Sequence, residues 1–161
     1  MGNRAVITTR KDLKDIGVYL QWNGGRDRVE GFLTYCQIKG FHPPEHDNYG
    51  WAYLCMTIGN FFGGEGFSLG IDVASKLDCD NWDNGTYIIK DWKIVDRLYQ
   101  RRGEQAVYPL MDMLLSIDEK QPKPLGEDAI KTALEKIKQE NRLRRRLISI
   151  PSTEQWTKSP F

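Results

Sequence analysis

A tight glycine turn followed by charged side chains is the first feature of this sequence that points to chemistry. The turn is Asn23-Gly24-Gly25, and Arg26 and Asp27 follow it where a helix is expected to begin. Two glycines at a helix entrance leave backbone N–H groups uncovered by any Cβ, which suits a phosphate or a carboxylate. Arg26 would add a planar charged donor. We therefore predict an anion-binding turn, although glycine is also common in turns that serve only backbone geometry.

Charged side chains in the first turns of the same predicted helix are candidates for catalysis and binding. Asp27 and Glu30 are three residues apart, so both would face the space over the glycine turn, where one could act as a general base on a hydroxyl or water. The plainer interpretation is that both interact with the helix dipole. Arg28 joins Arg26 as a candidate contact to nucleic acid.

A second acidic group lies between two predicted strands. Asp78, Asp80 and Asp83, with Asp72 upstream, could hold Mg²⁺, as hydrolysis of phosphodiesters often requires. The spacing does not fit an EF-hand loop. The ordinary explanation for such a group is that the aspartate side chains accept hydrogen bonds from the backbone of turns. Asp80 and Asp83 are nevertheless kept as catalytic candidates.

Cysteine and histidine residues give a weaker pattern. His42 and His46 are spaced like the paired histidines of a zinc finger, but the CxxC that should accompany them is missing. Cys36 and Cys55 fall within apolar helical patterns, where buried thiols are usually inert. We predict no metal site here and no cysteine nucleophile.

The strongest electrostatic feature is a run of arginines near the C-terminal end. Residues 127–147 carry seven basic and four acidic side chains, and the run holds Arg142, Arg144, Arg145 and Arg146. Closely spaced arginines on a helix can neutralise several phosphates, which predicts a salt-sensitive contact with nucleic acid. The alternative is a solvated helix end whose positive charge complements the helix dipole.

The pattern of apolar residues predicts an α+β fold, with a mostly antiparallel sheet and three to four packed helices. Alternation predicts strands over 4–9, 18–22, 67–73, 86–90 and 93–99, with the first two forming a hairpin and residues 67–100 forming a β-meander. Helical spacing predicts helices from Arg26, from Asp47 or Asn48, from Pro109, and over a long basic C-terminal segment. The expected organisation is a core over 1–121, a basic helix over 122–147 and an extended tail over 148–161, in which Trp156 and Phe161 could contact a partner.

Composition limits the classes of protein that fit. The 161-residue chain has a formal net charge of +1, so it lacks the acidic excess that mimicry of DNA requires. An odd number of cysteines fits reduced thiols, and no apolar run approaches the roughly 20 residues of a membrane span. We expect a cytoplasmic protein with no membrane partner. The oligomeric state is not indicated.

Three segments carry a resemblance to known proteins: VYLQWNGGRD, DNYGWAYLCMTIGNFFGG and DNGTYIIKDWKIV. Over residues 4 to about 100 the chain resembles small proteins carried by mobile elements and prophages of Gram-positive bacteria, a group associated with anti-CRISPR inhibitors of type II effector nucleases. The resemblance implies that the protein blocks an RNA-guided effector, by binding it or by attacking its guide RNA. It maps no active site onto these positions.

Three functions therefore remain open. The first is an inhibitor that engages the effector nuclease or its guide RNA, with RNA cleavage by Glu30 or the Asp80 and Asp83 pair as a further option. The second is a small hydrolase or transferase that binds a phosphorylated ligand at the glycine turn. The third is a non-catalytic interaction module that docks through its tail.

Overall fold

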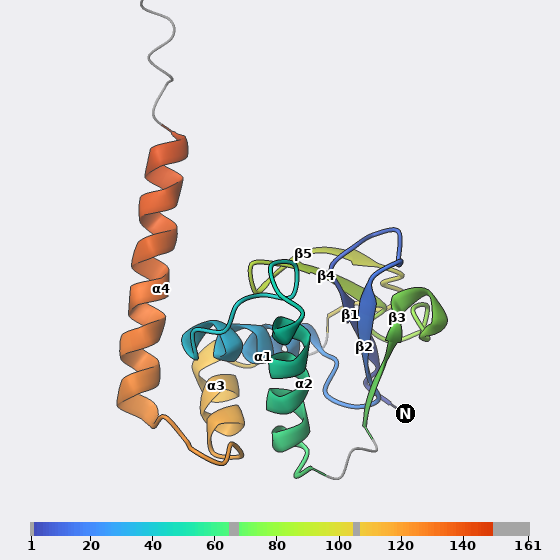
Figure 1. The fold of residues 1–161 in the computed structure, drawn as a ribbon, viewed down its shortest axis with the longest axis horizontal. Coiled ribbons are helices and arrows are strands. Elements are labelled where there is room, and N and C mark those ends of the chain that lie inside the picture. Colours follow the sequence, from blue (N-terminus) through green and yellow to red (C-terminus); the bar gives the residue numbers. More distant parts are fainter. Residues whose placement is uncertain (1, 65–67, 105–106, 150–161) are drawn as a thin grey trace, which may run out of the picture.

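The computed structural model describes residues 2–64, 68–104 and 107–149 and shows an α+β fold, as the sequence predicts. Figure 1 shows the sheet on one side of the body and three helices packed beside it, with the fourth helix standing alongside. The strands are β1 (Ala5–Thr8), β2 (Ile16–Leu20), β3 (Leu69–Val73), β4 (Thr86–Lys90) and β5 (Lys93–Leu98). The helices are α1 (Arg26–Ile38), α2 (Tyr49–Phe61), α3 (Leu110–Asp118) and α4 (Glu127–Ile148), with a short 3₁₀ turn over Ala74–Lys76.

The five strands form one mixed sheet in the order β3-β2-β1-β4-β5. The predicted β1–β2 hairpin is confirmed, with Ala5 opposite Leu20. The predicted meander over 67–100 is wrong: β3 pairs with β2 at one edge, whereas β4 pairs in parallel with β1 and antiparallel with β5. Alternation of apolar residues identifies a strand, but it does not determine which strand pairs with it. Here the acidic loop connects β3, at one edge of the sheet, to β4, on the far side of β1.

The core lies between the sheet and the helices. Strand residues such as Ile7 and Tyr87 are fully buried, and they pack with Phe32 of α1, Leu54 of α2 and Leu114 of α3. These helix residues fall at the spacing that the sequence pattern predicts for a buried face. Helix α3 begins directly after Pro109, as expected, because proline suits the first turn of a helix but not its interior.

Helix α4 buries apolar side chains against the body near its N-terminal end. Ile130 and Leu134 are buried, whereas Leu143, Leu147 and Ile148 are largely exposed. Figure 1 shows the C-terminal half of the helix rising beyond the body. The long basic helix is therefore present, and its arginine run lies on the half that projects.

No helix among the described residues is long and apolar enough to cross a membrane.

Candidate functional site

Contacts within the chain explain Gly24 of the glycine turn without a ligand. The amide of Gly24 donates to the carbonyl of Asn3 at 2.7 Å, and its carbonyl accepts the hydroxyl of Tyr87 at 2.9 Å. A Cβ on Gly24 would lie 2.6 Å from the Cβ of Ala5, so only glycine allows the turn to approach β1 this closely. Gly24 is therefore required by packing.

The entrance of α1 already contains an anion, which is the carboxylate of Asp27. Its Oδ1 accepts the amide of Arg28 at 2.7 Å and its Oδ2 accepts the amide of Tyr108 at 3.2 Å. A pocket of about 280 Å³ adjoins this carboxylate, and Glu104 lines it as well. Arg26 and Arg28 line the same pocket, so its lining carries charges of both signs, and a phosphate at the helix terminus would have to displace Asp27.

The other charged groups of α1 are paired or packed. Arg26 forms an ion pair with Glu30 on the next turn of the helix, with Nε and Oε1 2.8 Å apart. The guanidinium of Arg28 lies 4.6 Å from the ring centroid of Phe61 and donates to the hydroxyl of Ser116. Burial lowers the pKa of Arg28. The structure thus separates Arg28, which joins three helices, from Arg26 at the surface.

The acidic loop before β4 is neutralised by arginines from distant parts of the chain. Asp83 is buried and accepts the Nε of Arg4 at 2.8 Å, and Arg102 lies 3.5 Å from its other oxygen. Asp80 forms a two-bond pair with Arg101. Burial would raise the pKa of Asp83, but its bonds to Arg4 outweigh that effect and lower it.

The loop therefore has the character of an ion-pair network. Among the described residues, none of these aspartates belongs to a group of three whose potential metal-ligand atoms lie within 4.8 Å of one another. Asp80 and Asp83 remain catalytic candidates only if an arginine leaves its carboxylate, because a paired carboxylate is not free to bind Mg²⁺.

Cysteines and histidines do not come together. Cys36 is buried beside Thr57, and burial raises the pKa of its thiol to about 12. His42 lies 3.8 Å from Asp47, and His46 lies 3.8 Å from Asp91. An exposed group of Glu45, His46 and Asp91 has converging ligand atoms, but Glu45 already accepts the amide of Asp91.

The arginines of α4 differ from those of the body in their surroundings. Arg142, Arg144, Arg145 and Arg146 are exposed, and within the described part of the chain none of them lies within ion-pair distance of a carboxylate. The ion pairs of α4 lie nearer its start, where Lys131 bonds to Glu127 and Lys138 lies 3.6 Å from Glu135. The projecting half of the helix is consequently a concentrated, uncompensated positive charge.

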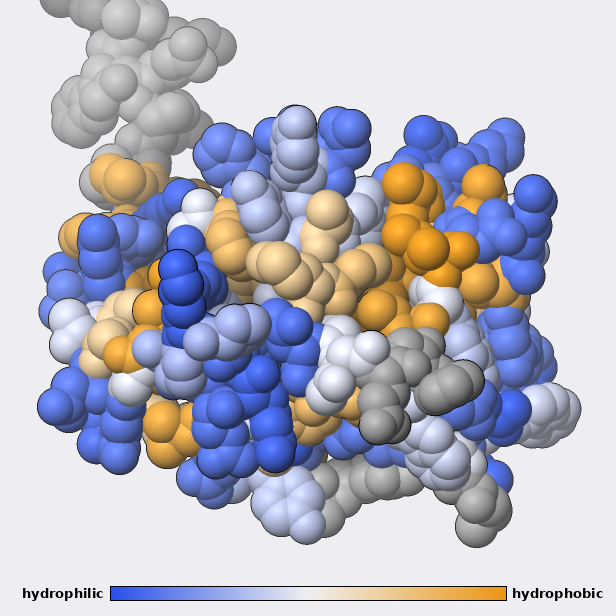
Figure 2. Space-filling model, turned by 60° about the horizontal axis from the view of Figure 1, so that its bottom comes forward, coloured by the Kyte–Doolittle hydropathy of each residue, from blue (hydrophilic) through white to orange (hydrophobic). Residues whose placement is uncertain are grey.

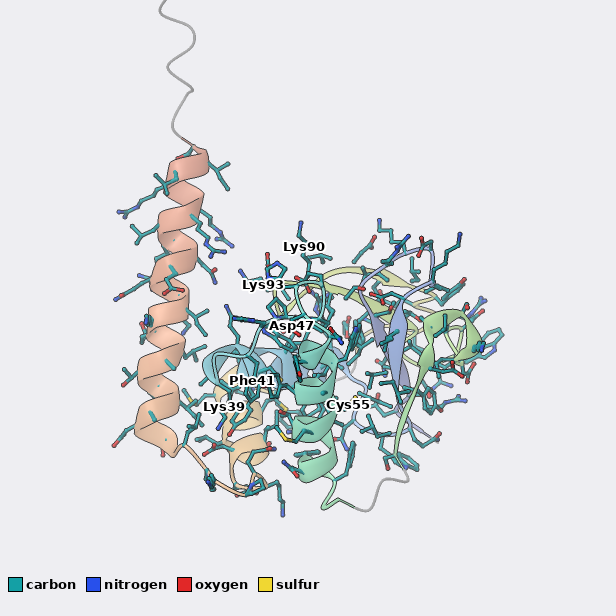
Figure 3. The ribbon with its side chains drawn as sticks, in the orientation of Figure 1. Lys39, Phe41, Asp47, Cys55, Lys90 and Lys93 are labelled. Atoms are coloured by element: carbon teal, nitrogen blue, oxygen red, sulfur yellow. The ribbon has the colours of Figure 1, made fainter. Side chains whose placement is uncertain are left out.

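Among the described residues, an exposed hydrogen bond links this half of α4 to the body. The ammonium of Lys93, at the β4–β5 hairpin, donates to the Oδ1 of Asn141 at 2.9 Å. Figure 3 shows Lys90 and Lys93 together at the edge of the body nearest the projecting half of α4. These two lysines add to the positive charge near the arginines. No local pattern in the sequence predicts this contact, because its partners are 48 residues apart.

The four tryptophans among the described residues fall into two groups. Trp51 and Trp92 are buried in the core, and the indole N–H of Trp92 donates to the carbonyl of Phe41. Trp22 and Trp82 are exposed, but the guanidinium of Arg101 already covers the ring of Trp82 at 4.4 Å. Trp156 and Phe161 lie outside the described residues.

No family model matches this chain, and no curated protein or solved structure is similar enough to count as a match.

Proposed function

We propose that the protein binds RNA through the projecting half of α4 and acts without cutting it. The observation that carries the proposal is a contrast between arginines within the described residues: Arg4, Arg26 and Arg101 are paired with carboxylates, whereas the four on α4 are not. An unpaired arginine on a helix away from the body can reach a phosphate without first breaking an ion pair. The resemblance noted above supports the guide RNA of a type II effector nuclease as the RNA, and inhibition of that nuclease as the outcome.

A binding measurement with matched variants tests this proposal. We expect replacement of Arg142, Arg144 and Arg145 by glutamine to weaken binding of a fluorescent guide RNA at least tenfold in an anisotropy titration, since each arginine contributes a phosphate contact. The control replaces Lys14, Lys120 and Lys123 by glutamine, which removes the same charge from exposed sites elsewhere. Equal losses in the two variants would mean that net charge alone governs binding, and the α4 site would then be rejected.

The absence of cleavage is a separate prediction. Glu30, Asp80 and Asp83 are all engaged with arginines, so we expect guide RNA to stay intact on a denaturing gel after incubation with the protein and Mg²⁺, with or without the effector. Shortened RNA of discrete length that disappears in Glu30→Ala or Asp80→Ala would show instead that the protein is a nuclease.

The hydrolase or transferase alternative receives less support from the structure. It requires a phosphate at the start of α1, where the carboxylate of Asp27 accepts the available amide of Arg28. The Asp27 pocket does not favour an anion over a cation, because Asp27 and Glu104 line it together with Arg26 and Arg28.

A further inference from the structure

The two edges of the sheet are protected to very different degrees. Edge strand β5 carries Lys93, Asp96 and Arg97, and its pairing with β4 has a register shift at Ile88 and Ile89. Charges and irregular pairing are the usual means by which an edge is kept from pairing with another chain. Edge strand β3 has the sequence LGIDV, and Asp72 is its one charged residue. It pairs with β2 over its whole length without a register shift.

Within the described part of the chain, the outer side of β3 presents backbone groups at alternate residues that have no backbone partner. The carbonyl of Ser68 accepts the amide of Gln21, and the amide of Ala74 donates to the carbonyl of Asp15, so the peptide groups of even-numbered residues face β2. Because these groups alternate along a strand, those of Leu69, Ile71 and Val73 face away from the sheet. Among them, the amide of Val73 bonds to the side chain of Asp72.

The same three residues also leave apolar side chains open to solvent. They lie opposite Leu20, Val18 and Ile16, so they point to the face of the sheet that the helices cover. Leu69 packs against the core, but Ile71 is 57% exposed and Val73 36% exposed, which shows that the helix layer stops short of this edge. In Figure 2 apolar side chains form a band across the middle of the molecule, over α2 and toward β3.

We propose that this edge pairs with the same edge of a second copy of the chain, in an antiparallel arrangement centred on Ile71. In that register Ile71 faces Ile71 of the second copy and exchanges both N–H···O bonds with it, because the peptide groups of Ile71 face outward. Leu69 faces Val73 on the helix side of the sheet, so apolar residues meet apolar residues. On the other side Asp72 faces Gly70, and no like charges lie directly opposite one another.

A second copy fits this edge because it supplies hydrogen-bond partners for the backbone and covers the exposed apolar side chains. Its own β3 satisfies the outward peptide groups, and its Ile71 and Val73 cover those of the first copy in the space that the helix layer leaves open. The two sheets then continue as one, with the helices of both copies on the same face. The pairing leaves both copies of α4 free, so it is independent of the proposed binding of RNA.

Mass measurements with a matched pair of variants test the proposal. Ile71 and Val95 are both 57% exposed and lie on opposite edges of the sheet, so Ile71→Lys and Val95→Lys place the same charge in comparable surroundings. We expect light scattering after size exclusion to show wild type and Val95→Lys shifting from 18.6 kDa toward twice that mass as concentration rises, and Ile71→Lys staying at 18.6 kDa. A wild-type chain that remains monomeric at several hundred micromolar overturns the proposal.

Cross-linking checks the register. The two Ile71 positions would have Cα atoms about 5.5 Å apart, a separation that a disulfide spans. We expect Ile71→Cys to form a disulfide-linked dimer under mild oxidation, at least tenfold faster than Val95→Cys. Equal rates for the two variants would rule out the two-fold arrangement about Ile71.

Discussion

Asp118 is the buried carboxylate that joins the end of α3 to the start of α4. Its Oδ1 accepts the hydroxyl of Tyr35 at 2.7 Å and the amide of Leu125 at 2.8 Å, and its Oδ2 accepts the amide of Gly126 at 2.9 Å. Burial alone would raise the pKa of Asp118, but these three donors outweigh it and lower the pKa below the ordinary value of 3.8. The carboxylate therefore fixes the direction in which α4 leaves the body.

Replacement of Asp118 by asparagine tests this role. We expect Asp118→Asn to lower the free energy of unfolding by about 1–3 kcal/mol at pH 7, because an amide cannot accept all three bonds. A lowered folded-state pKa stabilises the protein above the unfolded-state value and ceases to do so as pH falls through the folded-state value. Urea unfolding should therefore show a smaller difference between variant and wild type at pH 3 than at pH 7.

The control for this measurement is Asp112→Asn, an exposed position on the same helix. It should leave the free energy of unfolding nearly unchanged at both pH values. If Asp118→Asn behaves like this control, the carboxylate does not hold α4 in place.

At the scale of elements, the turn between β2 and α1 shows how close packing can resemble a binding motif. We expect Gly24→Ala to lower the free energy of unfolding by about 1–3 kcal/mol, since its Cβ would meet Ala5 and Asn3 at less than 3.0 Å. Gly25→Ala should be much milder, because the nearest atom, Oδ1 of Asp27, is 3.1 Å away on a side chain. Thermal unfolding of the two variants separates the outcomes, and equal melting temperatures would contradict this explanation of the turn.

Local pattern predicted most elements of this fold because each depends on residues near in sequence. The apolar spacing of α1 and α4, the break at Pro109 and the β1–β2 hairpin all belong to this group. The neighbouring strand of β3 was predicted wrongly, because the pairing of β3 with β2 depends on the shape and burial of residues that are distant in sequence.

The candidate sites were predictable only in part, for the same reason. The sequence shows Asp83 among turn residues, but not its partner Arg4, which lies 79 positions away. The arginine run on α4 can be recognised from the sequence alone. That its arginines are unpaired and that Lys93 reaches Asn141 became apparent only once the elements were placed.

For the molecule as a whole, a net charge of +1 conceals an uneven distribution. The body balances its charges through ion pairs such as Arg4 with Asp83 and Arg97 with Glu104. The projecting half of α4 has no such balance among the described residues. A protein with this distribution has a net charge near zero and still presents a local positive field to a polyanion.

The salt dependence of RNA binding tests the central claim most directly. If the four arginines of α4 each displace a counterion from RNA, a plot of log K against log salt concentration should have a slope of about −3, and the variant lacking Arg142, Arg144 and Arg145 should lose most of that slope. The Lys14, Lys120 and Lys123 variant should keep it. A wild-type affinity that does not change with salt, or a slope that the α4 variant retains, would contradict the account.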